Sequence, residues 1–136
     1  MDFLKSLSAL GLNPDNSVVI GSGILSALEI RKSKDIDVVV DDENYARLSK
    51  DTHFKKTQNH GQEILADELF EIGTYWGVLD KNQTFDDLLK QSQVVNGVRY
   101  ITLEFLFAVK ENWLQDDDVR QKDIDDVKLI KNYLTK

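Results

Sequence analysis

The stretch VVIGSGILSALEIRKSKDIDVVVD, residues 18–41, decides the fold. Its first three residues are β-branched and stop at a Gly-Ser-Gly turn, and the apolar residues from Ile24 to Ile30 then suit a compact buried helix. Residues 35–40 follow, with three consecutive valines after two acids, a pattern typical of a strand that is covered on both faces. We therefore predict a strand, a glycine turn, a helix and a second strand that is central in its sheet.

Cap and turn residues divide the remainder of the chain into short elements. Gly11 ends an opening helix, and Asp41, Thr84 and Thr102 each offer an N-cap to a later one. Asn96-Gly97 is the expected turn of a two-residue hairpin. The predicted helices cover 2–10, 41–50, 85–89, 103–114 and 120–134, and the predicted strands cover 54–57, 63–66 and 69–74 together with the hairpin at 94–100.

The length of 136 residues suits one domain, 1–136, with a core of its own. Hydrophobic residues make up 41% and charged residues 30%, which excludes a mainly disordered chain. Strand and helix alternate at first and then give way to consecutive strands. The expected class is therefore α/β (α+β), with a small mixed β-sheet flanked by α-helices.

The charge balance and the cysteine count narrow the chemistry. Twenty-four acidic residues against seventeen basic ones leave a net charge of −7, which argues against a broad nucleic-acid-binding surface and makes a metal cation a natural small partner. No cysteine is present, so thiolate catalysis and disulfide scaffolds are excluded. The N-terminus has no basic leader and no run approaches ~20 apolar residues, so we expect a cytoplasmic protein without membrane contact.

Three acids are distinguished by their positions. Asp35 and Asp37 are two residues apart on a predicted strand, so both side chains leave the same face while Ile36 points into the core. Glu71 lies between two large apolar residues on a later predicted strand, where a carboxylate needs compensation. A divalent cation shared by the three acids would supply it, so we predict a metal site at Asp35, Asp37 and Glu71.

The glycine turn predicts a phosphate site. Gly21 and Ser22 lie where a strand meets a helix, and free backbone N–H groups at a helix start favour phosphate. A phosphate cradle and a carboxylate pair for Mg²⁺ are the two halves of a nucleoside triphosphate site that transfers phosphoryl groups with two metals.

Two parts of this chain are Gly21-Ser22 and Arg31-Lys32-Ser33-Lys34-Asp35-Ile36-Asp37. Together they resemble the Gly-Ser…Asp-x-Asp signature of the DNA polymerase β-like nucleotidyltransferase superfamily. Glu71 is similar to the third acid of that superfamily. The chain looks most like the minimal nucleotidyltransferases and the nucleotidyltransferase toxin of type IV abortive-infection systems. In those proteins a basic residue and a Ser or Thr also precede the acidic pair, as Arg31 and Ser33 do here.

The C-terminal part resembles the later motifs of the same family. Lys110 lies on one predicted helix, and Arg120-x-Lys122-Asp123-x-x-Asp126 opens the next. The resemblance implies that Lys110 and Lys122 contact phosphates and that Arg31 and Ser33 belong to the nucleotide site. As ordinary surface residues, the two lysines also fit exposed positions on amphipathic helices, and Arg31 fits a solvated loop.

The resemblance implies an enzyme that depends on Mg²⁺ or Mn²⁺. It would transfer a nucleoside monophosphate from a nucleoside triphosphate such as ATP to an acceptor hydroxyl or phosphate. Asp35 and Asp37 would bind metal, Glu71 would join the metal that activates the acceptor or act as its general base, and Gly21-Ser22 would hold the leaving phosphates. The acceptor stays open between a small molecule, an RNA end and a protein. The predicted enzyme is compatible with a homodimer, with a protein partner and with membership of a toxin–antitoxin pair.

Two other functions compete with this one. The first is a nucleotidyltransferase-like module that binds or regulates without catalysis, a distinction that depends on Glu71. The second is a dinucleotide-binding Rossmann-like domain, because Gly21-x-Gly23 follows a strand and Asp41 ends the next one.

Overall fold

A mixed sheet organises the computed structural model, which describes residues 2–136. The strands, in chain order, are β1 (Ser17–Ile20), β2 (Ile36–Val40), β3 (Lys55–Asn59), β4 (Gln62–Ala66), β5 (Phe70–Gly73), β6 (Tyr75–Val78), β7 (Lys81–Thr84), β8 (Ser92–Val95) and β9 (Val98–Ile101). The helices are α1 (Phe3–Ala9), α2 (Gly23–Ala27), α3 (Asp42–Ser49), α4 (Phe85–Leu89), α5 (Leu103–Trp113) and α6 (Gln121–Leu134). Seven strands form the sheet in the order β3-β4-β5-β2-β1-β9-β8, and β6 and β7 form a separate hairpin. The predicted mixed α/β class is confirmed.

β2 occupies the middle of the sheet because its side chains are almost all apolar. Four of its five residues are at most 1% exposed, namely Ile36, Val38, Val39 and Val40. It pairs antiparallel with β1 and parallel with β5, so it has a strand on each side as well as cover on both faces. The only polar side chain of β2, that of Asp37, therefore sits in a rigid and largely apolar setting.

The pairing of β1 with β2 excludes the Rossmann alternative. A dinucleotide-binding unit needs two parallel strands joined by a crossover helix. Here β1 and β2 run antiparallel, with Ser17 opposite Val40, and α2 ends at Ala27, three residues earlier than the apolar run predicts. Asp41, the acidic residue of that alternative, instead caps α3 by accepting a hydrogen bond from the Asn44 N–H at 3.0 Å.

The turn and cap residues act as predicted. Asn96 and Gly97 join β8 to β9 and both have positive φ, 50° and 81°, as a two-residue hairpin requires. The side chains of Thr84 and Thr102 accept backbone N–H groups in the first turns of α4 and α5.

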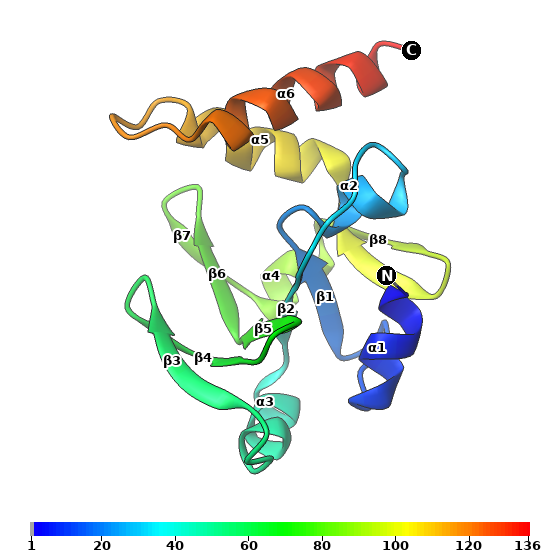
Figure 1. The fold of residues 1–136 in the computed structure, drawn as a ribbon, viewed down its shortest axis with the longest axis vertical. Coiled ribbons are helices and arrows are strands. Elements are labelled where there is room, and N and C mark those ends of the chain that lie inside the picture. The colour runs from blue at the N-terminus through cyan, green and yellow to red at the C-terminus, as the bar shows by residue number, and fades with distance from the viewer. Residues whose placement is uncertain (1) are drawn as a thin grey trace.

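The β6–β7 hairpin is the element that the sequence does not predict. Its turn is made by Leu79 and Asp80, both at positive φ, and neither is a glycine or an asparagine. A leucine rarely adopts this conformation, so the usual hairpin signal is missing. The hairpin nevertheless matters, because it stands over one face of the sheet (Figure 1).

α5 and α6 pack against each other and lie together across one end of the molecule (Figure 1). Leu106 of α5 and Ile130 of α6 are fully buried and belong to the common hydrophobic core. Among residues 2–136 no helix has both the length and the apolar character that a membrane span needs.

Gly23 allows α2 to approach the sheet closely. A β-carbon at this position would overlap the Val19 side chain and come within 3.6 Å of the Tyr100 ring. Both neighbours are themselves buried on β1 and β9, so neither has space to retreat.

We expect Gly23→Ala to destabilise the protein by roughly 1–3 kcal/mol, since overpacking a closed core forces backbone shifts. Urea unfolding followed by circular dichroism measures the change. Gly77→Ala is the matched control, because a β-carbon there meets only the Asn82 amide oxygen at an ordinary 3.5 Å. Equal stabilities for the two variants would contradict this account of Gly23.

Candidate active site

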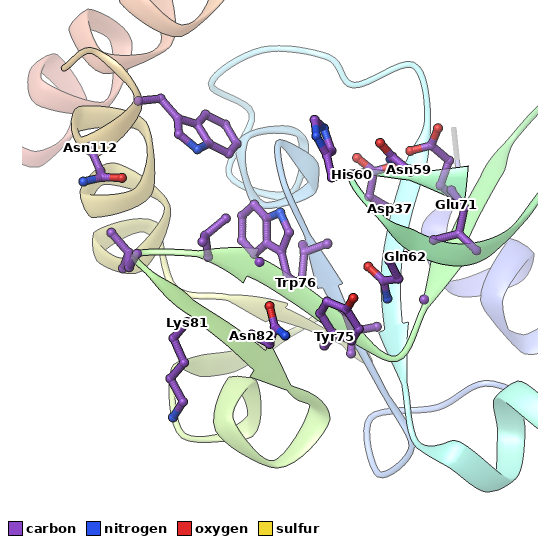
Figure 2. A pocket seen from close by; sticks show the side chains of 18 of the residues that line it. Asp37, Asn59, His60, Gln62, Glu71, Tyr75, Trp76, Lys81, Asn82 and Asn112 are labelled. Atoms are coloured by element: carbon purple, nitrogen blue, oxygen red, sulfur yellow. The ribbon is translucent and has the colours of Figure 1, made fainter. Parts of the chain in front are cut away.

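Asp37 and Glu71 lie next to each other on the two central strands. The parallel pairing of β2 with β5 places Asp37 directly opposite Glu71, so their side chains leave the same face of the sheet. Neighbouring strands are ~4.8 Å apart, a spacing at which two carboxyl groups can share one cation. Figure 2 shows both side chains at one side of a pocket, with Asn59 close to them.

The acid pair is electrostatically strained. Burial raises the pKa of Asp37, and the charge and hydrogen bond of Glu71 together with the charge of Asp35 raise it further, to about 7. Lys122 acts in the opposite direction and lowers this pKa. Two carboxylates crowded in this way need a proton or a cation between them, which is the donor chemistry that a divalent metal fits.

Asp35 stands apart from the pair. It lies one residue before β2 and is exposed, although its charge reaches Asp37. Within residues 2–136 no three acidic or histidine side chains are grouped closely enough to hold a metal ion. The site as it stands is thus a pair, Asp37 and Glu71, and the participation of Asp35 as a third ligand stays a prediction.

The Gly-Ser turn and the segment before β2 meet beside the acids. Gly21 has φ +64°, and a β-carbon there would lie 3.2 Å from Oδ2 of Asp37, so glycine keeps this approach open. The Oγ atoms of Ser22 and Ser33 are 3.2 Å apart, and the Ser33 hydroxyl donates to the Asp35 carbonyl at 3.0 Å. Ser22 and Ser33, 11 positions apart in the sequence, thus form one small polar cluster.

Lys122 approaches the same site from the C-terminal helix. It lies in the first turn of α6, its side chain is exposed, and its charge stabilises ionised Asp37. An exposed ammonium at this position is available to an anionic ligand that binds beside the acid pair.

Arg31 and Lys110 are engaged elsewhere. The Arg31 guanidinium binds both carboxylate oxygens of Asp126, at 2.6 and 2.8 Å. Lys110 is only 3% exposed, and its Nζ lies 2.8 Å from Asp123 and 2.9 Å from Asp126. The expectations of a solvated loop for Arg31 and of an exposed helix position for Lys110 are therefore wrong. The apolar periodicity of α6 offers one signal for this network, since Asp123 and Asp126 share the buried face with Val127 and Ile130.

A cleft of about 1000 Å³ opens beside the acid pair. Its walls are the sheet face that carries Asp37 and Glu71, the β6–β7 hairpin, and the segment that links α5 to α6. Trp76 of the hairpin and Trp113 of α5 meet edge to face with their ring centroids 6.2 Å apart, and both line the cleft. In the view of Figure 2, Trp76 stands between the acids and Asn112 of α5. Sequence reasoning missed this cleft because it missed the hairpin.

Comparison with solved structures gives two matches to the antibiotic-resistance factor ANT(2'')-Ia, a nucleotidyltransferase. Its solution structure is 17% identical and aligns with a TM-score of 0.56 over 88% of this chain and 75% of that one. Its crystal structure in complex with adenylyl-2''-tobramycin is 16% identical, with the same TM-score, over 88% of this chain and 79% of that one. No protein-family model and no curated protein matches the sequence. At this level of identity the similarity shows that the chain shares the fold of ANT(2'')-Ia.

Asp37→Asn should stabilise the metal-free protein at high pH. Because the pKa of Asp37 is raised from 3.8 to about 7, the folded state holds this proton more tightly than the unfolded chain, and stability is lost as the pH rises between these values. Asparagine cannot ionise, so the variant does not lose this stability. We expect the free energy of unfolding of Asp37→Asn to exceed that of the wild type by on the order of 1–2 kcal/mol at pH 8, and to equal it near pH 4. The gain is smaller than the full pKa shift would give, because the cleft is open to solvent.

Thermal unfolding in EDTA across this pH range measures the effect. Glu111→Gln, at an exposed position on α5, is the control and should leave the pH dependence unchanged. A lower melting temperature for Asp37→Asn at pH 8 would contradict the strain assigned to the acid pair.

Proposed function

We propose that this chain is a nucleotidyltransferase that moves a nucleoside monophosphate from a nucleoside triphosphate to an acceptor hydroxyl or phosphate, with Mg²⁺ or Mn²⁺. The observation that carries the proposal is the meeting of Asp37 and Glu71 on adjacent parallel strands, directly beside the open face of Gly21. The nucleotidyltransferase fold supports it.

The acids would hold the metal. Asp37 and Glu71 supply two adjacent carboxylates, and Asp35, one residue before β2, is the third candidate ligand. A divalent ion bound there would neutralise the charge that develops on the α-phosphate and its leaving group. Glu71 is also the candidate general base for the acceptor hydroxyl, the role that the family resemblance implies for it.

The phosphates would lie against the polar cluster. Gly21 leaves room for a close approach of the backbone, and Ser22 and Ser33 present hydroxyl groups there. Lys122 adds the exposed positive charge. The resemblance also implies a nucleotide contact for Arg31 and Lys110, but Arg31 is bound to Asp126, and Lys110 to Asp123 and Asp126.

The acceptor would enter the cleft between the sheet and the β6–β7 hairpin. The Trp76–Trp113 pair, packed edge to face, gives this cleft an aromatic surface, and the acid pair lines the same cleft. ANT(2'')-Ia has been seen with adenylyl-2''-tobramycin, which favours a small molecule over an RNA end or a protein as the first acceptor to test. Since the reaction consumes a nucleoside triphosphate, we place it in the cytoplasm and take ATP as the first donor to test.

A binding module without catalysis is the second candidate. It is favoured by the exposed position of Asp35, which leaves the described residues without a group of three metal ligands. Such a module would bind a nucleotide with Mg²⁺ and release no pyrophosphate.

The test measures binding of ATP, GTP, CTP and UTP with Mg²⁺ to the wild type and to Asp35→Asn/Asp37→Asn, followed by pyrophosphate release with candidate acceptors. We expect metal-dependent binding by the wild type and none by the double variant. Absence of metal-dependent binding by the wild type, or equal binding by both proteins, would overturn the proposal. Binding without pyrophosphate release would select the non-catalytic module.

Lys122→Gln should weaken nucleotide binding roughly tenfold, because a charge-assisted contact to phosphate is lost. Calorimetric titration with a non-hydrolysable ATP analogue and Mg²⁺ measures the change. Lys128→Gln, an exposed lysine farther along the same helix, is the matched control and should bind as the wild type does. Similar affinities for the two variants would remove Lys122 from the site.

A further inference from the structure

A buried ion-pair network joins the segment before β2 to the C-terminal helix. Arg31 and Asp126 are 95 positions apart in the sequence, yet the guanidinium fork meets the carboxylate with two hydrogen bonds. The Asp126 side chain is 2% exposed and that of Arg31 is 24% exposed. A bidentate pair of this kind fixes the orientation of both groups as well as their distance.

Asp126 itself is held independently of Arg31. Lys110 of α5 bridges Asp123 and Asp126 of α6. Arg120 also pairs with Asp123, so the two buried carboxylates are paired with three cations, Lys110, Arg31 and Arg120. Burial acts to raise the pKa of Asp126, but the hydrogen bonds from Arg31 and Lys110 outweigh it and keep that pKa below its usual value. Arg31 is therefore attached to an anchor that α5 and α6 already hold.

On the other side, Arg31 leads directly to the candidate active site. Its Nη1 donates to the Lys32 carbonyl at 3.0 Å, which fixes the backbone of the next residue. Ser33 follows and bonds to both Ser22 and the Asp35 carbonyl. Lys32, Lys34 and Asp35 are exposed, so the segment has little apolar packing to hold it in place.

We propose that Arg31 and Asp126 are positioning residues. Their ion pair orders residues 31–35 on α6, and this holds Ser33 against Ser22 and keeps Asp35 near Asp37. The consequence for metal binding rests on the proposed function, whereas the ordering of the segment does not. Buried ion pairs contribute little net stability compared with apolar packing, but they specify one arrangement. Arg31 thus acts through the segment and does not contact the reacting groups.

Arg31→Met tests the inference with little risk to the fold. Methionine keeps an apolar stem, and the variant leaves both contacts of Lys110 in place, so the helix pair stays joined. The matched control is Arg47→Met, which removes another arginine tether, from Nη2 to the Leu10 carbonyl at 2.8 Å, on α3. Circular dichroism establishes that both variants are folded.

Two measurements follow on the full chain. Backbone ¹⁵N order parameters of residues 32–35, without ligand, should fall from about 0.85 to below about 0.6 in Arg31→Met. Mn²⁺ affinity, measured by electron paramagnetic resonance, should weaken about tenfold, the usual cost of losing a group that orients a metal ligand. Arg47→Met should change neither quantity.

Asp126→Asn supplies a second test from the other partner, with its exposed neighbour Asp125→Asn as control. Because Arg31 and Asp126 act as one unit, the double variant Arg31→Met/Asp126→Asn should lose no more Mn²⁺ affinity than the weaker-binding single variant. Additive losses in the double variant would overturn the inference.

The inference would also be overturned if folded Arg31→Met kept the order parameters of the wild type. It would be overturned as well if the order parameters of residues 32–35 fell while the Mn²⁺ affinity stayed unchanged. Weaker ATP binding with unchanged order parameters would make Arg31 a phosphate contact instead, and overturns it as well. Failure of the proposed function has a different signature, since the wild type then binds no Mn²⁺. Lower order parameters in Arg31→Met would still support the ordering of the segment in that case.

Discussion

The contact between two like-charged groups, Asp37 and Glu71, is the constraint on which the rest of the structure depends. Side chains of equal charge on opposed sheet positions destabilise a sheet. This pair nevertheless sits on the two central strands, where the apolar residues of β2 hold the backbone rigidly. The cost shows in the raised pKa of Asp37. Because the core holds the two carboxyl groups together, the binding of a cation between Asp37 and Glu71 is strongly favoured.

The surroundings of the pair divide into groups that approach it and groups that are kept away. Gly21 leaves the Asp37 carboxylate uncovered on one side, and Lys122 offsets part of its charge on another. Arg31, by contrast, is bound to Asp126, and Lys110 is bound to Asp123 and Asp126. Both cations are thus paired with carboxylates of α6, and it is the charge of Lys122 that acts on Asp37.

Local patterns in the sequence predicted the strands, turns and helix caps that are determined by residues close together in the chain. The apolar run of β2, the Asn96-Gly97 turn and the caps at Thr84 and Thr102 are all decided within a few residues, and the structure contains each of them. The predicted metal site shared by Asp35, Asp37 and Glu71 requires β2 and β5 to be close, but no local pattern predicts their parallel register. The Leu79-Asp80 turn carries no glycine, and the cleft that its hairpin encloses was missed with it.

The ion pairs of Arg31 and Lys110 show why charged residues are the hardest to assign from sequence. An apolar side chain is buried against any apolar neighbour, so its spacing alone predicts its face. A charged side chain is buried only where an oppositely charged partner can pair with it, and the partner of Arg31 is 95 positions away in the sequence. The same specificity gives α6 its place in the site. Lys122 and Asp126, one helical turn apart, reach Asp37 and the segment before β2 respectively, so the last helix of the chain couples both sides of the acid pair.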